Sequence, residues 1–418
     1  MQKNMPDVLI LGGGVIGLAC AYYLLKAGRT VCVLERDAIG AATSLGNCGT
    51  ITPSHIPPLA APGMVLKAMK WMLTPDAPFY VKPTLDPHLI AWLLKFAGRC
   101  NQKDWRASSL AKMDLLHNSR HLLEQLVQQE NLVCEFAATG MHNVYKSQAG
   151  FEKAAIESEA VREFGLVSQI LSSEALTNDE PALKSGMAGA VHYPGDAHLR
   201  PDLYTAELAR VVRLLGGSII EQCEVLGIET THDKVQKVIT ALGEYQAQDY
   251  CFALGPWSPT MMKAIGINLP VQPGKGYSIT YTRPSIAPKR PIVLKERSVC
   301  VTTWSSGYRL GSTMEFSGYD TRLNRRRLDA LERGANEYLQ EGVGPLKLEE
   351  WYGWRPMTTD DLPILGATPN YENAWLATGH GMLGVSMSAI TGHLLADLIC
   401  QRTPIINPAP YSIQRFAS

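Results

Sequence analysis

Three glycines near the amino terminus have a spacing suited to holding a dinucleotide. Gly12, Gly14 and Gly17 form a G-x-G-x-x-G motif, with an apolar run at 8–11 before it and an apolar helical segment ending near Gly28 after it. In such a unit the first glycine permits a tight turn, the second lets backbone approach a pyrophosphate, and the third lets helix pack against strand. The amino terminus of the helix supplies free N–H groups for the phosphates.

A second apolar segment, residues 30–34, leads into Glu35. A carboxylate at this position accepts hydrogen bonds from ribose hydroxyls and disfavours a 2′-phosphate. Taken alone, the glycine motif could be a turn that binds no ligand, but strand, helix and acid together predict a dinucleotide site. The motif does not distinguish NAD from FAD.

Two later segments favour FAD. Residues 40–53 are rich in small and hydroxyl side chains, which would let the chain approach a flat polar ligand, although a flexible surface loop has the same composition. Residues 250–258 form an apolar run that leads into Gly255, and this resembles the second nucleotide-proximal turn of FAD proteins. A Rossmann enzyme that binds only NAD has no need of such a turn.

The sequences GGGVIG and TSLGNCGTITP together resemble the opening of the FAD-dependent D-amino-acid dehydrogenase group, within the D-amino-acid oxidase and glycine oxidase superfamily. The resemblance implies that Thr43, Ser44, Asn47 and Gly49 line the flavin. Some relatives attach FAD through a histidine in this loop, and Asn47 occupies the comparable place. Residues 353–366 also lack the cysteine that carries the flavin in sarcosine oxidases, so we expect non-covalent FAD.

A glycine cluster near the carboxyl terminus, GHGMLG at 379–384, precedes an Ala- and Ser-rich run that predicts a helix reaching Ile399. The amino terminus of that helix would stabilise negative charge near N1 and O2 of a reduced flavin. The full set of expected cofactor contacts adds to the residues above Arg36, Val225, Gly255, Trp257, Gly379, His380, Gly381, Met382, Leu383 and Gly384.

Arg355 begins an R-P-x-T-x-D-x-x-P-x-x-G segment that resembles one in this superfamily. The resemblance implies that Arg355 binds the substrate carboxylate, a task suited to a planar, permanently charged fork. The alternative is a structural salt bridge to Asp360 or Asp361. We also expect Tyr277 to contribute a phenol to the substrate pocket, although a core tyrosine is almost equally compatible with the sequence, and Arg309 is the next candidate if Arg355 is structural.

Asp196 and His198 lie in a polar loop before a helix that begins near Pro201. They could form a catalytic pair, but oxidation of an amine by flavin requires no residue at the Cα proton, and such loops usually serve helix capping.

The predicted fold is α/β, α+β overall, with a Rossmann-like FAD-binding domain and an interposed substrate domain of mixed sheet and helices. We expect the FAD-binding domain to be discontinuous, at 1–56, 190–262 and 346–418. The substrate or cap domain would comprise 57–189 and 263–345.

The resemblance implies hydride transfer from Cα of a D-amino acid to flavin N5, which gives an imino acid and then a 2-oxo acid and ammonia. A quinone or another acceptor in place of oxygen would take the electrons. The alternatives are a D-proline or D-hydroxyproline dehydrogenase, a glycine- or sarcosine-type oxidase that uses dioxygen, and a flavin-binding subunit without a substrate pocket.

The Pro-, Met-, Trp- and Leu-rich stretch 59–100 has two interpretations. It could form cap helices that pack inward, or a peripheral membrane contact in which Lys67, Lys70 and Lys95 meet lipid headgroups. A dehydrogenase that reduces quinone would need such a contact.

Composition excludes several classes of protein. The 39 basic and 39 acidic residues give no electrostatic case for a nucleic-acid partner. Nine cysteines without a C-x-x-C pair predict free thiols and no metal cluster. The sequence has neither a signal-peptide pattern nor a long uncharged apolar run, so we expect a cytoplasmic location, with peripheral contact to the inner face of a bacterial plasma membrane as the variant.

Overall fold

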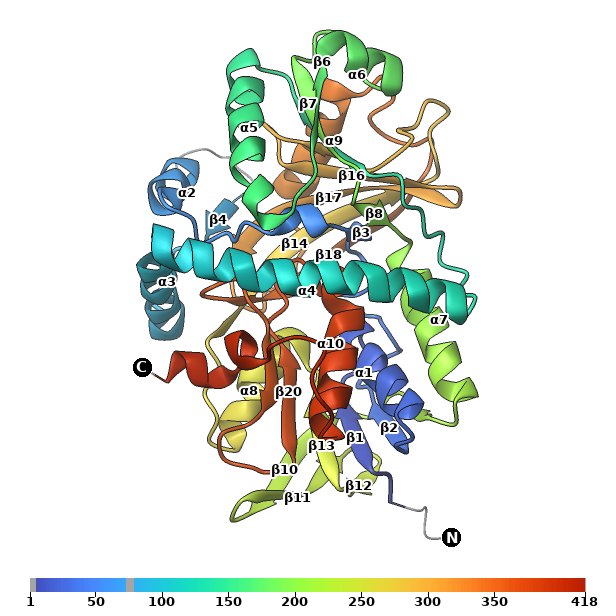
Figure 1. The fold of residues 1–418 in the computed structure, drawn as a ribbon, viewed down its shortest axis with the longest axis vertical. Helices are drawn as coiled ribbons and strands as arrows, with labels where there is room; N and C mark the ends of the chain where they lie inside the picture. The colour runs from blue at the N-terminus through green and yellow to red at the C-terminus, as the bar shows by residue number, and fades with distance from the viewer. Residues whose placement is uncertain (1–4, 73–78, 418) are drawn as a thin grey trace.

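The computed structural model describes residues 5–72 and 79–417. Figure 1 shows two stacked regions, the lower one containing β1 and α1 and the upper one containing β7, β16 and β17. The long helix α4 (Gln102–Gln129) crosses between them. The expected α/β class, with a Rossmann-like region and an interposed region of mixed sheet and helix, is confirmed.

In the described residues, the lower region is built on a six-stranded sheet of order β19-β20-β13-β1-β2-β9. Its strands are β1 (Val8–Leu11), β2 (Val31–Leu34), β9 (Ser218–Ile220), β13 (Asp249–Phe252), β19 (Ile364–Ala367) and β20 (Ala374–Thr378). Pairing is parallel from β20 to β9, and β19 runs antiparallel at the edge. Both faces of a parallel sheet are covered, which is why β1 reads as a continuous apolar run and is wholly buried.

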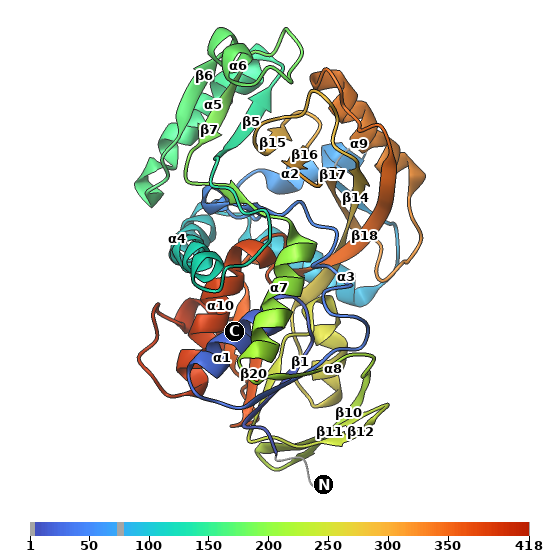
Figure 2. The same cartoon turned by 90° about the vertical axis from the view of Figure 1, so that its right-hand side faces the viewer.

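Three helices cover one face of this sheet. α1 (Val15–Lys26) packs between α7 (Pro201–Leu214) and α10 (Gly384–Ile399), as Figure 1 shows, and in the view of Figure 2 α7 lies in front of α1. The approach of α10 to α1 depends on Gly392, where a Cβ would lie 2.4 Å from the carbonyl oxygen of Ala19. The helices expected near Pro201 and up to Ile399 are therefore confirmed.

The upper region is built on a sheet that has nine strands in the described residues, in the order β18-β14-β17-β16-β15-β5-β7-β6 with β4 paired to β17. The strands are β4 (Phe79–Val81), β5 (Met141–Tyr145), β6 (Gln169–Ser172), β7 (Gly189–Tyr193), β14 (Val271–Tyr281), β15 (Ile292–Leu294), β16 (Val299–Trp304), β17 (Gly307–Phe316) and β18 (Lys347–Thr358). Helix α9 (Arg325–Tyr338) packs on the strands from β14 to β17.

Smaller elements complete the described chain: α2 (Met64–Met72), α3 (Pro87–Arg99), α5 (Gln148–Ala160), α6 (Ser173–Asp179), α8 (Ser258–Ala264), the strand pair β3 (Thr50–Ile51) and β8 (Ala197–His198), and the three-stranded sheet of β10 (Val225–Thr231), β11 (Lys234–Thr240) and β12 (Gly243–Tyr245). Two strands lie in a different region of the molecule from the one that the predicted domain boundaries assigned to them. β7 and β18 pair within the nine-stranded sheet, whereas the boundaries at 190 and 346 assigned them to the FAD-binding domain. A strand's sheet partner is not encoded locally, and the residue boundaries of the two domains stay a prediction.

Candidate active site

A cavity of about 850 Å³ lies where the carboxyl end of β1 meets β14, β17 and β18. Its wall contains nearly all of the predicted site residues, from Gly12 and Gly14 at one end to Arg355 and the segment 380–384 at the other. Gly17, Gly49 and Gly379 are not in the wall. The structure therefore brings together segments from the start, middle and end of the chain.

Two of the motif glycines have packing roles. Gly12 has a φ of +107°, and a Cβ there would lie 2.5 Å from the carbonyl oxygen of Ala253. A Cβ at Gly17 would lie 1.9 Å from the carbonyl oxygen of Gly12. Gly14 stands at the N-cap of α1, where no side chain of the cap closes the helix end. The N–H of Val15 donates to Ser44 Oγ at 3.0 Å, and the helix start lies beside the cavity.

Glu35 and its neighbours form the end of the cavity nearest β2. The Glu35 carboxylate accepts hydrogen bonds from the backbone N–H groups of Gly13 at 2.7 Å and Asp37 at 3.0 Å. The guanidinium of Arg36 lies 4.7 Å from the ring centroid of Trp257, and Val225 completes this part of the wall. The Glu35 carboxylate can accept hydrogen bonds, and the flat side chains of Arg36 and Trp257 lie nearby, so this end of the cavity suits a nucleoside.

The loop 40–53 is held in place by hydrogen bonds rather than being a free surface loop. Thr43 Oγ1 donates to the carbonyl oxygen of Trp354 at 2.7 Å. The Asn47 side chain donates to the carbonyl of Ser44 at 2.9 Å and accepts from the N–H of Gly49 at 2.8 Å. Gly49 has a φ of +65° and packs against residue 199. Thr43, Ser44 and Asn47 thereby face the cavity with fixed geometry.

Arg355 projects from β18 into the cavity beside Gly276 of β14, where a Cβ would lie 2.4 Å from its Nη2 atom. Its Nη1 group donates to the carbonyl oxygen of Thr313. Burial lowers the pKa of this guanidinium. Among the described residues no carboxylate lies within ion-pair distance, so the alternative of a salt bridge to Asp360 or Asp361 is not what the structure contains.

Those two aspartates instead fix the chain that follows Arg355. Lys112 of α4 pairs with Asp361 at 2.7 Å, and both side chains are buried. Arg415, near the carboxyl terminus, pairs with Asp360 at 2.7 Å. Sequence reasoning missed Lys112 and Arg415, because nothing in the local pattern connects either residue to the segment that each one anchors.

Tyr277 lines the cavity but its phenol is already engaged. Its hydroxyl donates to Glu315 at 3.3 Å, and the side chain is 1% exposed. Burial first, and the Glu315 carboxylate second, raise the pKa of this phenol. A role of Tyr277 in substrate binding stays a prediction, and the geometry favours contact through the ring rather than the hydroxyl.

The segment 379–384 forms a turn that leads into α10. Gly379 and Gly381 have φ values of +78° and +54°, and the N–H of Gly381 donates to the carbonyl of Pro356 at 3.0 Å. His380 Nε2 lies 3.0 Å from Thr391 Oγ1, and burial lowers the pKa of the imidazole to about 3. The ring is therefore neutral near pH 7, and the start of α10 has no side-chain cap from residue 383.

Asp196 and His198 do not form a pair at the cavity. Asp196 accepts hydrogen bonds from the N–H and hydroxyl of Ser54 at 3.0 and 2.6 Å, and burial raises its pKa to about 7. His198 Nδ1 lies 3.4 Å from the hydroxyl of Thr139. Neither side chain lines the cavity, and neither caps the helix α7, whose N-cap residue Arg200 makes no side-chain cap hydrogen bond.

Among the polar side chains of the wall that were missed from the sequence, three have a buried atom without a partner in the described residues. Thr52 Oγ1, His55 Nδ1 and Thr313 Oγ1 are buried and have no partner within the described chain. Burial lowers the pKa of His55 to about 3. No motif marks these positions, because each depends on the placement of a loop or strand end against a distant part of the chain.

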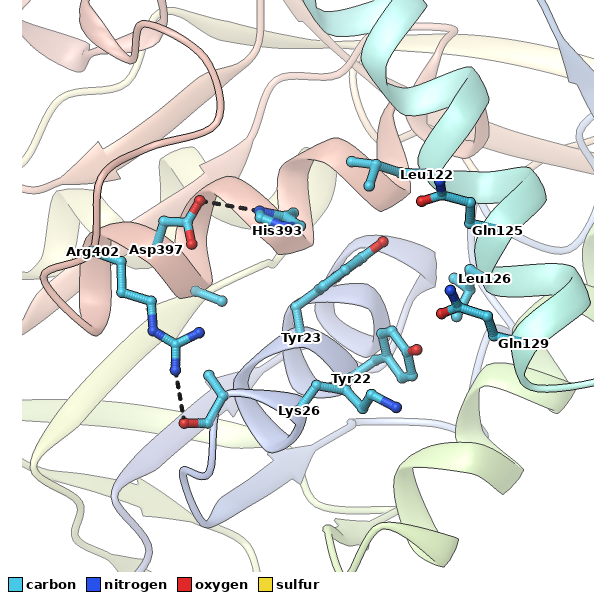
Figure 3. A pocket seen from close by; sticks show the side chains of 12 residues that line it. Tyr22, Tyr23, Lys26, Leu122, Gln125, Leu126, Gln129, His393, Asp397 and Arg402 are labelled. Carbon is cyan, nitrogen blue, oxygen red and sulfur yellow. Dashed lines mark hydrogen bonds and ion pairs between the residues drawn. The ribbon is translucent and has the colours of Figure 1, made fainter.

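Another cavity, of about 280 Å³, lies at the carboxyl-terminal part of α1, between that helix, α4 and α10 (Figure 3). Its charged side chains are occupied: His393 pairs with Asp397 at 3.1 Å, Arg402 donates to the carbonyl of Ala27 at 3.0 Å, and Lys26 pairs with Glu130 at 3.2 Å. This cavity contains none of the predicted site residues.

Comparisons with known proteins agree with this geometry. Residues 7–398 match the family model described as FAD dependent oxidoreductase, DAO. The chain belongs to that family. It is 34% identical over 416 residues to a D-amino acid dehydrogenase of Granulibacter bethesdensis, covering 98% of this chain and 99% of the relative. It is 34% identical over 419 residues to a D-amino acid dehydrogenase of Chromohalobacter salexigens, covering 99% and 100%.

Solved structures show the same fold. Glycine oxidase from Geobacillus kaustophilus has a TM-score of 0.79 at 22% identity, with 99% of each chain covered. L-proline dehydrogenase from P. horikoshii has a TM-score of 0.76 at 18% identity, with 99% of this chain and 98% of that one covered. The resemblance drawn from the sequence is thus confirmed, and the protein is an FAD-dependent oxidoreductase.

The residues present fit the cofactor of the family. The starts of α1 and α10 both border the cavity, and each provides a positive dipole end for a negatively charged group. The unpartnered polar atoms of Thr52, His55 and Thr313 border the same space. A large cavity with two helix starts and unsatisfied polar groups is suited to a dinucleotide.

Proposed function

We propose that the protein oxidises D-amino acids to imino acids, which water converts to 2-oxo acids and ammonia, and that a quinone or another acceptor in place of oxygen receives the electrons. The relatives that are 34% identical over almost the whole chain carry the name D-amino acid dehydrogenase, which supports this assignment. FAD, when bound, supplies the oxidant that takes a hydride from Cα.

The observation that carries the proposal is the state of Arg355. Its Nη1 group has the carbonyl of Thr313 as acceptor, but its Nε and Nη2 groups have no hydrogen-bond partner among the described residues, and the guanidinium borders the cavity. A planar cation with unused N–H groups at an apolar pocket is suited to a carboxylate, which it binds with defined orientation. Arg355 would thus fix the Cα–H of the substrate.

The surrounding wall favours a neutral, apolar side chain. Trp92, Phe96 and Phe316 border the cavity, and the Trp92 ring lies 5.4 Å from Phe96 and 5.2 Å from Phe316. These residues exclude water from the reacting atoms, and exclusion of water strengthens the interaction between carboxylate and guanidinium. The neutral ring of His380 adds no positive charge at pH 7.

An anaerobic panel of D- and L-amino acids, scored by bleaching of flavin absorbance, tests the proposal. Bleaching by neutral D-amino acids and not by their L-enantiomers is the expected result. Preference for D-proline or hydroxyproline would narrow the proposed substrate class to cyclic amino acids. Preference for glycine or sarcosine would replace D-amino acids as the proposed substrates. Absence of bleaching by any amino acid would reject an amino-acid substrate. Stopped-flow reoxidation by a quinone that is faster than reoxidation by air would support the proposed acceptor.

We also propose that FAD is held non-covalently. Asn47 offers no histidine at one attachment place, and residues 353–366 offer no cysteine at the other. Acid denaturation of the purified protein should release all flavin fluorescence into the supernatant. Fluorescence that stays with the precipitated chain would contradict this.

The surface of α2 and α3 supports a peripheral membrane contact, although residues 73–78 of the stretch 59–100 lie outside the described residues. Leu66 and Met69 on α2 and Leu94 on α3 are 68%, 62% and 69% exposed, and Figure 1 places both helices on one side of the molecule. Lys67 and Lys70 lie among the apolar residues of α2. Both helices also contribute to the cavity wall, so the surface that would meet lipid adjoins the site.

No helix within the described ranges is both long and apolar enough to cross a membrane. The peripheral contact is tested by co-sedimentation with anionic lipid vesicles. Leu66→Glu should reduce the bound fraction, whereas Ile156→Glu, at a residue 73% exposed on α5, should not. Equal binding of the two variants to the vesicles would reject the membrane contact, and the inward packing of α2 and α3 would be the remaining interpretation.

A further inference from the structure

Two cysteine side chains meet in the wall of the large cavity. Cys300 on β16 pairs directly with Gly311 on β17. Side chains of directly opposed residues lie on the same face, with Cβ atoms about 5 Å apart. A Cβ built on Gly311 would lie 2.5 Å from Sγ of Cys48. The thiol of Cys48 therefore occupies the space above Gly311, beside the side chain of Cys300, and all three residues border the cavity.

The two thiols differ in their electrostatic surroundings. A hydrogen bond with the Cys300 thiol lowers the pKa of Cys48, and the guanidinium groups of Arg309 and Arg355 lower it further against the opposing effect of burial. The same hydrogen bond, followed by burial, raises the pKa of Cys300. The positive charge of Arg309 and Arg355 beside Cys48 favours the thiolate form that attacks peroxide, and Cys300 is placed to act as the resolving thiol.

We propose that Cys48 and Cys300 are an oxidisable thiol pair, which hydrogen peroxide converts to a disulfide across the cavity wall. The Cys48 thiol gives up its proton, and its sulfur attacks one peroxide oxygen. The O–O bond breaks, Cys48 becomes a sulfenic acid, and the departing hydroxide takes up that proton to form the first water. The Cys300 sulfur then attacks the Cys48 sulfur, its proton joins the departing hydroxide, and water leaves. Two thiols lose two electrons in total, and one peroxide becomes two waters.

A second cysteine pair in this chain provides an internal comparison. Cys20 of α1 and Cys251 of β13 are hydrogen-bonded, and both are 0% exposed in the core. Neither borders one of the two cavities, and the pKa of Cys20 is raised by that hydrogen bond and by burial. Both pairs therefore place two thiols close together. Only the pair of Cys48 and Cys300 also borders a cavity that a small oxidant can enter and lies near positive charge.

The disulfide would tie the loop that contains Asn47 to β16. That loop faces the cavity, and two of its carbonyls hold Arg309. Oxidation should therefore reduce activity, a consequence that rests on the proposed function. The formation of the disulfide does not rest on it, because that is a property of the two thiols.

The test treats the purified protein, with its flavin, with increasing hydrogen peroxide, blocks free thiols by alkylation, and maps peptides by mass spectrometry. The expected product is a peptide that joins Cys48 to Cys300, reversed by dithiothreitol, while Cys20 and Cys251 remain alkylated after denaturation. Cys300→Ser should abolish the joined peptide and leave oxygen added to Cys48. The control Cys400→Ser, at a cysteine after α10, should form the same joined peptide as the unaltered protein.

The proposal is overturned if Cys48 and Cys300 remain reduced at peroxide concentrations that oxidise methionine, or if Cys48 joins a different cysteine. Activity should fall in proportion to the joined peptide and return with dithiothreitol, whereas in Cys300→Ser any loss of activity should follow the oxygen added to Cys48. If no amino acid bleaches the flavin, the proposed function fails, whereas the peptide map still decides the thiol pair.

Discussion

Arg309 and Arg355 lie on the two strands that flank β14, yet their surroundings are opposite. Arg309 on β17 is 2% exposed, and its Nε and Nη1 groups donate to three neutral acceptors. Its Nε group donates to Thr280 Oγ1 at 2.9 Å, and Nη1 donates to the carbonyl oxygens of Leu45 and Asn47 at 2.9 and 2.8 Å. This arginine holds the loop 40–53 and does not border the cavity.

Arg355 on β18 has instead one strong acceptor, the carbonyl of Thr313, and a long contact of 3.9 Å to the sulfur of Met314. The rest of its guanidinium borders the cavity. Of these two arginines, on the strands that flank β14, one is thus a structural hydrogen-bond donor and the other is available to a ligand. The number of acceptors that each already has, rather than its burial or charge, separates the two roles.

Replacing Arg309 by methionine should have the largest effect on folding. Arg309→Met leaves the carbonyls of Leu45 and Asn47 and the hydroxyl of Thr280 without their donor, at a site where water does not replace it. Loss of hydrogen bonds to a charged donor should lower the free energy of unfolding by about 3 kcal/mol. Urea denaturation measures this, and FAD content should fall with it. Normal stability with lost substrate affinity would reverse the comparison and make Arg309 the anchor.

Replacing Arg355 by lysine should affect kinetics rather than folding. Arg355→Lys retains a charge but loses the planar fork that orients the carboxylate. The expected cost is roughly 1.5–3 kcal/mol, about ten- to a hundredfold in kcat/KM. Steady-state kinetics with a dye acceptor, beside the flavin spectrum, measures it. Loss of flavin with normal activity per bound FAD would show that Arg355 is structural.

Gly276 offers a way to displace the Arg355 guanidinium without changing its charge. A Cβ there would lie 2.4 Å from Nη2 and 2.5 Å from Cζ, so Gly276→Ala should force the flexible end of Arg355 away from its position. We expect about a tenfold fall in kcat/KM, roughly 1.4 kcal/mol. Gly227→Ala in β10 is the matched control, since its nearest atom would be 3.9 Å away. Equal kinetics for the two variants would mean that the position of the guanidinium is not critical.

The sequence was informative where one short segment determines both structure and role. β1, the Gly12 turn and α1 follow from consecutive residues, and the turn at 379–384 with α10 does so as well. Arg355 could be selected because its own segment carries a pattern. The sequence does not predict that the guanidinium of Arg355 is available to a ligand. This depends on Thr313 of another strand and on the absence of a nearby carboxylate among the described residues.

The features that could not be predicted from the sequence are contacts between segments that lie far apart in the chain. Lys112 and Asp361 are separated by most of the chain, as are Arg309 and Leu45, and Cys48 and Cys300. Each pairing requires a particular strand register or helix position, and a shift of one residue in a strand turns its side chains to the other face. The place of β18 in the nine-stranded sheet has the same origin.

The smallest effect is expected for the ion pair of Arg309, and it sharpens the account of how that arginine is held. Glu349 Oε2 lies 3.8 Å from Nη2 of Arg309, and the Glu349 side chain is 38% exposed. A long ion pair with a solvated partner contributes little, because water screens the charges.

Glu349→Gln should therefore change the free energy of unfolding by less than about 0.5 kcal/mol and leave kcat/KM unaltered. Urea denaturation at low and at high salt measures it. A loss as large as that of Arg309→Met, or one that disappears at high salt, would show that the carboxylate rather than the carbonyls of the loop holds Arg309, and the contrast with Arg355 would then rest on charge instead of on the number of acceptors.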